Sequence, residues 1–161
     1  MEFLDIVDRQ DKVIGTASRA DIYKKSLCHR IVHVLIFNRE NEMALQLRSD
    51  QVSFCPRHWS TAVGGHVQSN ESYIDAALRE YKEELGITSK LEKIAKDYYK
   101  AENSPDKFLV TFKSFFDGPF HPDKKAVDQV SFFTIEQIKE MVNTGENFHP
   151  ELLFLLRKYF F

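Results

Sequence analysis

Three glutamates that lie close together in the chain, Glu80, Glu83 and Glu84, are the residues best suited to chemistry. On a helix this spacing puts all three on one arc. Their mutual repulsion is roughly a few tenths of a kcal/mol per pair when they are exposed. A divalent cation would relieve it, and hard oxygen ligands suit Mg²⁺. A solvated acidic helix face is the plainer interpretation, and the run alone does not separate the two.

A helix following Asn70 is expected to position these glutamates. Asn70 is a good N-cap, and Gly86 ends the pattern. Arg79 lies one turn before Glu83, close enough to orient it by a charge-assisted hydrogen bond. The expected core face comprises Ile74, Ala77, Leu78, Tyr81 and Leu85, with Ala76 on the acidic side.

The stretch that leads into this helix contains the pair Gly64-Gly65. We predict a glycine loop there. Gly65 permits either the close approach of a ligand to the backbone or simply a tight turn.

The rest of the chain predicts strands and helices in alternation. Strands are expected at residues 3–7, 13–16, 29–38, 43–48, 91–100, 108–116 and 127–133, and further helices at 19–25, at 134–142 and from Pro150 onward. Residues 29–38 are apolar on both alternating faces, which is typical of a central strand. Interleaved elements indicate an α/β fold with a mixed sheet and helices on its faces. The length fits a single domain over residues 1–161.

Composition narrows the classes of function. The net charge is −2 and no long basic run occurs, which argues against a nucleic acid polymer as partner. Two cysteines without CxxC spacing favour a reducing compartment. No signal peptide or membrane-spanning run is present, so we expect a soluble cytoplasmic protein with no membrane partner. The apolar residues 159–161 either pack back on the domain or contact a second copy in a homodimer.

The helix and its flanks resemble a known motif. Gly65, then Glu71 after five residues, then Arg79-Glu80-Tyr81-Lys82-Glu83-Glu84-Leu85-Gly86-Ile87 after seven more, is similar to the Nudix box of the Nudix hydrolase superfamily. Tyr81 stands where an aliphatic residue is usual. The resemblance implies an α/β/α sandwich and Mg²⁺ or Mn²⁺ as cofactor. It also implies a small-molecule substrate, a nucleoside diphosphate linked to another moiety, whose diphosphate bond is cleaved by water.

The resemblance also assigns roles to individual residues. Glu80 and Glu84 correspond to the main metal ligands, and Glu83 to a ligand or the general base. The Gly65 carbonyl corresponds to a further ligand. Glu71 and Arg79 correspond to orienting residues.

Residues outside the box are further candidates. Arg48 and Arg57 are expected to flank the pocket, where they either hold substrate phosphates or are ordinary surface arginines. The family often places another acid on the late strand, where this chain has Ala126. Asp128 is expected to share a strand face with Ala126, so it either substitutes as a metal ligand or that ligand is missing.

A looser similarity extends over about residues 3–160, to the isopentenyl-diphosphate isomerase-like branch. It is carried by Val13-Ile14-Gly15, His29-Arg30, residues 45–49 and Trp59 ahead of Gly64. Gly64 stands where an isomerase has its catalytic cysteine, and Cys55 is about nine residues too early to replace it. We therefore favour hydrolysis over allylic isomerisation.

Two further interpretations depend on the same comparison. His29 and His66 match two histidines of the isomerase metal site, but Ile22 falls near a third, so structural histidines are favoured. A non-catalytic nucleotide-binding module is the remaining alternative, and the complete box argues against it.

Overall fold

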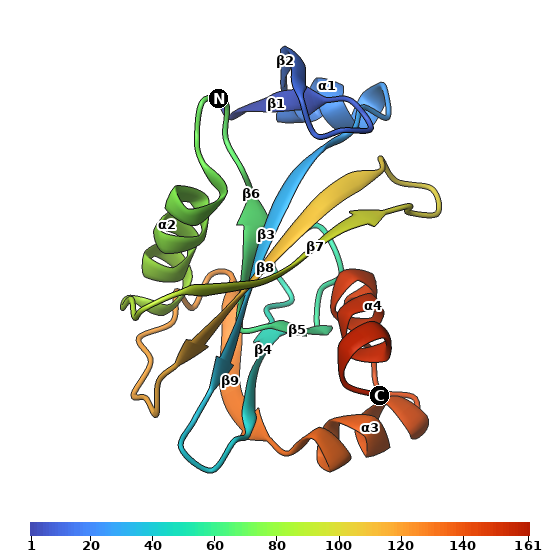
Figure 1. Ribbon diagram of the computed structural model, residues 1–161. Helices are drawn as coiled ribbons and strands as arrows, with labels where there is room; N and C mark the ends of the chain where they lie inside the picture. Colours follow the sequence, from blue (N-terminus) through green and yellow to red (C-terminus); the bar gives the residue numbers. More distant parts are fainter.

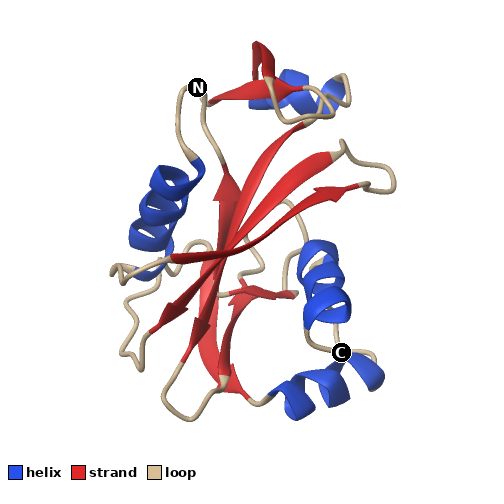
Figure 2. Ribbon diagram, viewed as in Figure 1, coloured by secondary structure: helices blue, strands red, loops and turns tan.

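The computed structural model describes all residues from Met1 to Phe161. It contains one seven-stranded mixed sheet, in the order β5-β4-β3-β8-β7, with β6 paired to β3 and β9 paired to β4 (Figures 1 and 2). A separate two-stranded sheet pairs β1 with β2. The strands are β1 Phe3–Val7, β2 Val13–Ser18, β3 His29–Phe37, β4 Met43–Arg48, β5 Trp59–Thr61, β6 Val63–His66, β7 Glu92–Tyr99, β8 Lys107–Phe115 and β9 Val127–Phe133, and the helices are α1 Arg19–Lys24, α2 Tyr73–Leu85, α3 Ile135–Asn143 and α4 Pro150–Tyr159.

Strand β3 is the centre of the sheet, as its apolar run predicted. It pairs in parallel with β8 over its whole length and antiparallel with β6. Because strand side chains alternate between faces, Val32, Val34 and Ile36 join one core cluster, whereas Leu35 and Phe37 join another.

The two clusters lie on opposite faces of the sheet, each covered by helices. Helix α2 covers the first, and α3 and α4 cover the second (Figure 1). This arrangement confirms the expected α/β/α sandwich with a mixed sheet.

Helix α2 begins later than the sequence predicted. Its N-cap is Ser72, whose hydroxyl accepts from the backbone N–H of Asp75, whereas Asn70 adopts a left-handed conformation with φ of 64°. Ser72 can cap because its extended backbone leaves the hydroxyl free to reach the helix start.

The buried face of α2 also differs from the expectation. Ala76 and Ala77 are fully buried beside Tyr81, whereas Ile74 and Leu78 are about 46% and 37% exposed. The alanines have small side chains, and α2 rests on β6 and β3 along this face. The buried face predicted from the large apolar residues is therefore rotated about the helix axis relative to the face that packs against the sheet.

The pair Gly64 and Gly65 is not a loop, contrary to the prediction. Both residues belong to β6 and pair with His33 and Val32 of β3. Gly86 does end α2 as expected, with φ of 74°.

The N-terminal sheet, formed by β1 and β2, holds the segment before α2 in place. Asp5 of β1 accepts hydrogen bonds from the Ser69 hydroxyl and from the backbone N–H of Asn70.

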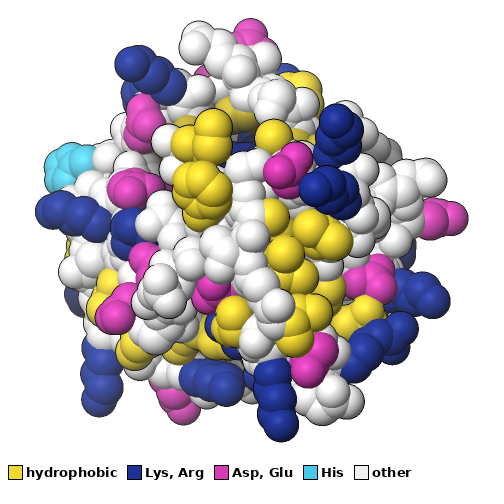
Figure 3. All heavy atoms as spheres, turned by 90° about the horizontal axis from the view of Figure 1, so that it is seen from above, with side chains coloured by type: hydrophobic (Ala, Val, Ile, Leu, Met, Phe, Trp, Pro, Cys, Tyr) yellow, Lys and Arg dark blue, Asp and Glu magenta, His cyan; other side chains and the backbone are white.

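The N-terminal sheet and α1 form one end of the molecule. Seen from this end, apolar side chains are exposed among acidic and basic ones (Figure 3). Val13 and Ile14 of β2 are among the exposed apolar residues.

The apolar C-terminus packs back in part. Phe160 packs against the second core cluster, and the Tyr159 hydroxyl donates to Asp97 at 2.9 Å. No helix in the structure has the length and apolar character needed to cross a membrane.

Candidate active site

A cavity of about 820 Å³ brings together residues from both halves of the chain. Its wall is mainly polar and charged. The charged side chains that line it are Glu2, Arg19, Arg48, Glu80, Glu83, Glu84, Lys107, Asp123 and Glu151.

All three glutamates of α2 face this cavity. Glu84 is partly buried: its Oε1 accepts from Gln46 Nε2 at 2.9 Å, and its Oε2 accepts from the Gly64 backbone N–H at 3.2 Å. Burial and the nearby charge of Glu80 raise the pKa of Glu84 to about 8. Burial also raises the pKa of Glu80 to about 7, although the Arg79 guanidinium opposes that rise. The side chain of Glu83 is 59% exposed.

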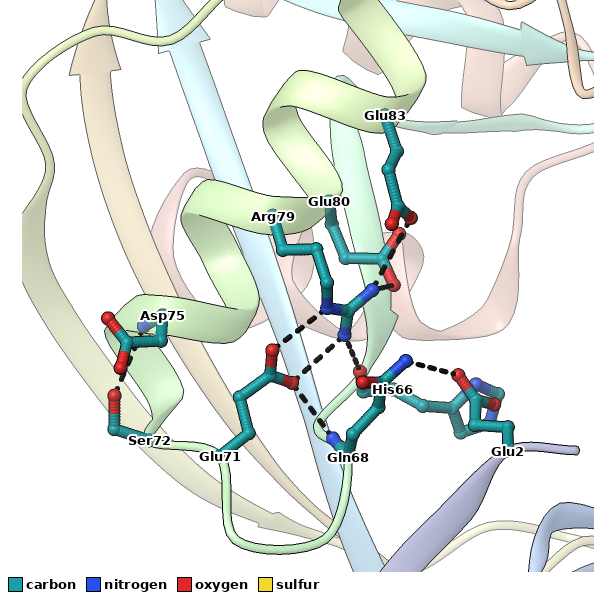
Figure 4. A network of polar contacts seen from close by, with 9 residues as sticks. All are labelled: Glu2, His66, Gln68, Glu71, Ser72, Asp75, Arg79, Glu80 and Glu83. Carbon is teal, nitrogen blue, oxygen red and sulfur yellow. Dashed lines mark hydrogen bonds and ion pairs between the residues drawn. The ribbon is translucent and has the colours of Figure 1, made fainter.

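Arg79 is the centre of the polar network beside these acids (Figure 4). Its guanidinium makes a two-pronged contact with Glu71, with N–O distances of 2.8 and 2.9 Å. It also donates to Glu80 at 2.8 Å, to Glu83 at 3.4 Å and to the carbonyl of His66 at 3.0 Å. A planar guanidinium with five donors can bind several carboxylates in fixed geometry, so Arg79 fixes how the acids point.

Glu71 links this network to the segment before the helix. Besides Arg79, it accepts a hydrogen bond from the Gln68 backbone N–H at 2.9 Å. Although burial opposes the change, the Arg79 guanidinium lowers the pKa of Glu71, which therefore stays ionised.

Gly65 is required by the close approach of β6 to α2. A β-carbon at position 65 would lie 2.3 Å from Glu80 Cδ and 2.4 Å from Glu80 Oε1. Only glycine leaves the Glu80 carboxylate in its observed place.

The acidic wall fits a hard divalent cation. Its donors are carboxylate oxygens, and the enclosed carboxylate of Glu84 has only an amide and a backbone N–H as partners. No group of three or more His, Cys, Asp or Glu side chains is arranged as a complete metal-binding site. Mg²⁺ commonly uses one or two carboxylates and takes its other ligands from water and substrate phosphates.

Asp128 and Arg57 do not line the cavity, which corrects the expectation for both. They form an ion pair at 2.7 Å, with each side chain about half exposed. The pairing of β4 with β9 skips from Gln129 to Val127, so Asp128 is the extra residue of a β-bulge. A bulge breaks the alternation of side chains, and the argument that Asp128 shares a face with Ala126 therefore fails.

Asp123 is the acid that this part of the chain contributes to the cavity instead. Its backbone N–H donates to the carbonyl of Glu84 at 2.9 Å, and His121 donates likewise to Leu85. These bonds satisfy carbonyls at the end of α2 and bring Asp123 close to the glutamates. The sequence carried only a weak signal for this residue, an acid shortly before the late strand.

Arg48 does line the cavity, as expected. Its Nε donates to the carbonyl of Phe54 at 3.0 Å, and its charge lowers the pKa of Glu84, opposing the effect of burial.

A buried ion network forms another part of the wall, and the sequence did not predict it. Glu151 contacts His33 Nε2 at 2.9 Å through Oε1 and accepts from Lys107 Nζ at 2.8 Å through Oε2. His33 Nδ1 lies 2.7 Å from the Thr61 hydroxyl. These residues come from α4, β3, β8 and β5, and no local pattern could have linked them.

His29 and His66 stack on each other, with ring centroids 5.5 Å apart. His66 Nε2 lies 2.7 Å from the Tyr23 hydroxyl, and His29 Nδ1 lies 3.0 Å from the carbonyl of Leu27. Burial lowers the pKa of His29 to about 4 and that of His66 to about 3, so both rings are neutral near pH 7.

Comparison with known proteins assigns the chain to a family. Residues 28–156 match the family model described as NUDIX domain. The chain is 31% identical over 166 residues to the Nudix hydrolase all7351 of Nostoc, which covers 99% of this chain and 96% of the relative. It is 29% identical over 158 residues to the Nudix hydrolase PA4841 of Pseudomonas aeruginosa, which covers 98% and 93%. The crystal structure of DR0079 from Deinococcus radiodurans superposes with a TM-score of 0.87 at 24% identity, covering 99% of this chain and all of that one.

The chain therefore belongs to the Nudix family and is a Nudix hydrolase.

Proposed function

We propose that this Nudix hydrolase uses Mg²⁺ or Mn²⁺ to cleave the diphosphate bond of a nucleoside diphosphate linked to another moiety. The observation that carries the proposal is the set of three glutamates on one wall of the cavity, with two pKa values raised by burial and mutual repulsion. A bound cation would offset both effects, and substrate phosphates would complete its coordination.

Glu80 and Glu84 are the proposed metal ligands, and the backbone carbonyl of Gly65 is a third. When bound, the metal supplies positive charge to the phosphoryl oxygens and acidity to an attacking water. Arg79 holds Glu80 in place and is itself held by Glu71.

Glu83 is the proposed general base. It is the most exposed of the three acids and has one long contact, with Arg79 at 3.4 Å. In the proposed step it takes a proton from the water whose oxygen attacks phosphorus, while the bridging P–O bond breaks and the leaving phosphate departs with the bond electrons. Arg48, on the cavity wall, is proposed to hold a phosphate.

We favour hydrolysis over the isomerase reaction, because Gly64 stands where an isomerase would have its catalytic cysteine. A β-carbon on Gly64 would lie 3.3 Å from both His33 Nδ1 and Thr61 Oγ1, so even the start of a cysteine side chain would be crowded there. Incubation with isopentenyl diphosphate discriminates the two reactions: an isomerised product without phosphate release would support the isomerase.

A panel of nucleoside diphosphate conjugates with Mg²⁺ or Mn²⁺ tests the proposal directly. Released phosphate or nucleotide is measured for the wild type, for Glu84→Gln and for the exposed control Glu140→Gln. We expect Glu84→Gln to abolish metal-dependent hydrolysis and Glu140→Gln to keep it. Full activity in Glu84→Gln would contradict the assignment, and ligand binding without any turnover would favour a binding module.

A further inference from the structure

One region of the cavity wall carries a buried lysine that the proposed reaction does not use. Lys107, at the start of β8, is 4% exposed and lines the cavity. Its ammonium donates one hydrogen bond, to Glu151 at 2.8 Å. An ammonium has three donors, so two remain without an acceptor in the protein.

The surroundings of Lys107 hold it in one place. Glu151 is itself buried and is fixed by His33 on its other oxygen. The Lys107 ammonium also lies 5.8 Å from the centre of the Tyr23 ring. Although burial opposes the change, the Glu151 carboxylate raises the pKa of Lys107, so the side chain is a positioned cation.

Two arginines from other elements face the same cavity. Arg19, at the start of α1, makes no side-chain hydrogen bond, and Arg48 uses only Nε, for the carbonyl of Phe54. The cations therefore come from α1, β4 and β8, whereas the three glutamates come from α2 alone. An anion that enters this cavity finds free N–H donors on these cations, although the carboxylates of Glu2 and Glu151 also line it.

We propose that Lys107 and Arg19 form a subsite for an oxyanion, a phosphate or carboxylate group that the substrate carries beyond its diphosphate, while Arg48 serves the diphosphate itself. This assignment rests on the proposed function for the identity of the ligand as substrate. The diphosphate itself belongs with the glutamates and their cation, so Lys107 is left for a second anionic group. The substrate class is then a diphosphate whose second moiety is itself negatively charged.

Calorimetric titration of metal-free, full-length protein with inorganic phosphate tests the subsite without any turnover. We expect Lys107→Gln to weaken phosphate binding about 10-fold or more and Arg19→Gln to weaken it several-fold, because each loses charge-assisted donors. Lys25→Gln, which removes the same charge from an exposed position outside the cavity, should change it less than about 2-fold. A parallel titration with malonate distinguishes carboxylate from phosphate as the preferred group.

Two results would overturn the subsite: no binding of either anion by the wild type, or unchanged binding in Lys107→Gln. Circular dichroism establishes whether Lys107→Gln is folded. If it is not, Arg19→Gln decides, since its exposed side chain can be replaced without disturbing the core.

Hydrolysis of matched substrate pairs then tests the substrate class. NADP⁺ and NAD⁺, which differ by one phosphate monoester, form one such pair in a wider panel. We expect kcat/KM to favour phosphorylated members about 10-fold in the wild type and to lose that preference in Lys107→Gln. If substrates are hydrolysed but no pair shows a preference for the phosphorylated member, the proposed substrate class is wrong. If no member of the panel is hydrolysed, the result counts against the proposed function, and the phosphate titration alone then tests the subsite.

Discussion

Alanine at position 65 would test whether the close approach of β6 to α2 sets the position of the Glu80 carboxylate. The added β-carbon would lie 2.3 Å from Glu80 Cδ. Since carbon atoms in contact sit about 3.5 Å apart, the carboxylate must move by roughly 1 Å. A misplacement of this size costs about 100-fold in rate when the group acts in catalysis, and we expect kcat/KM to fall by about that factor.

The effect of the same substitution on stability should be modest. Loss of the charged hydrogen bond between Arg79 and Glu80 costs about 1.5–3 kcal/mol. Replacement of a glycine outside the left-handed region offsets this by about 0.4–1 kcal/mol, because the unfolded chain loses freedom. The net loss of about 1–2 kcal/mol corresponds to a fall in Tm of roughly 2–8 °C for a chain of this size.

Metal-dependent hydrolysis and thermal unfolding, measured on the same preparations, check both numbers. Gly15→Ala is the matched control, because its β-carbon would make only an ordinary contact of 3.5 Å with Ile6. It should leave kcat/KM unchanged. A folded Gly65→Ala variant with wild-type kcat/KM would refute the link between this glycine and the position of Glu80.

Three further predictions concern the ion network, the acidic wall and the helix cap. Glu151→Gln breaks a buried ion pair and should lower the free energy of unfolding by about 3–5 kcal/mol in urea titrations. The control Glu136→Gln, at an exposed position, should change it by less than about 0.5 kcal/mol. If both variants changed the free energy of unfolding equally, the ion network would contribute nothing to stability. The pKa values of about 7 for Glu80 and about 8 for Glu84 lie above the ordinary value of 4.5. In metal-free protein the stability that these groups contribute is therefore present below pH 4.5, falls as pH rises from there, and is lost above about pH 8. Mg²⁺ needs the deprotonated forms, so calorimetry should show affinity increasing from pH 6 to 9 with release of protons; an affinity independent of pH would contradict the assignment. Ser72→Ala should cost about 0.5–2 kcal/mol in thermal unfolding, and no loss would mean that Ser72 is not the effective cap.

The sequence predicted most strands and helices because their signals are local. The apolar run of β3, the end of α2 at Gly86 and the start of α4 at Pro150 depend on nearby residues only. The three glutamates of α2 were likewise predicted together, since helical spacing alone puts them on one arc.

Features that depend on tertiary contacts could not be read from the sequence. Asp128 turns away because of a bulge against β4, and a bulge leaves no trace in a seven-residue strand. The buried face of α2 follows Ala76 and Ala77 because they let the helix approach β6 closely. Lys107 meets Glu151 across 44 residues of chain, and neither has a local reason to be buried.

The parallel pairing of β3 with β8 has a consequence for biosynthesis. His29 is paired with Lys107 and Phe37 with Phe115, so the central ladder joins segments 78 residues apart. Chains emerge from the ribosome in order, and contacts over long sequence separations form late. Until β8 has emerged, one edge of β3 remains without its partner and its apolar side chains lack part of their cover. We therefore expect the nascent chain to depend most on chaperone protection between the synthesis of β3 and that of β8.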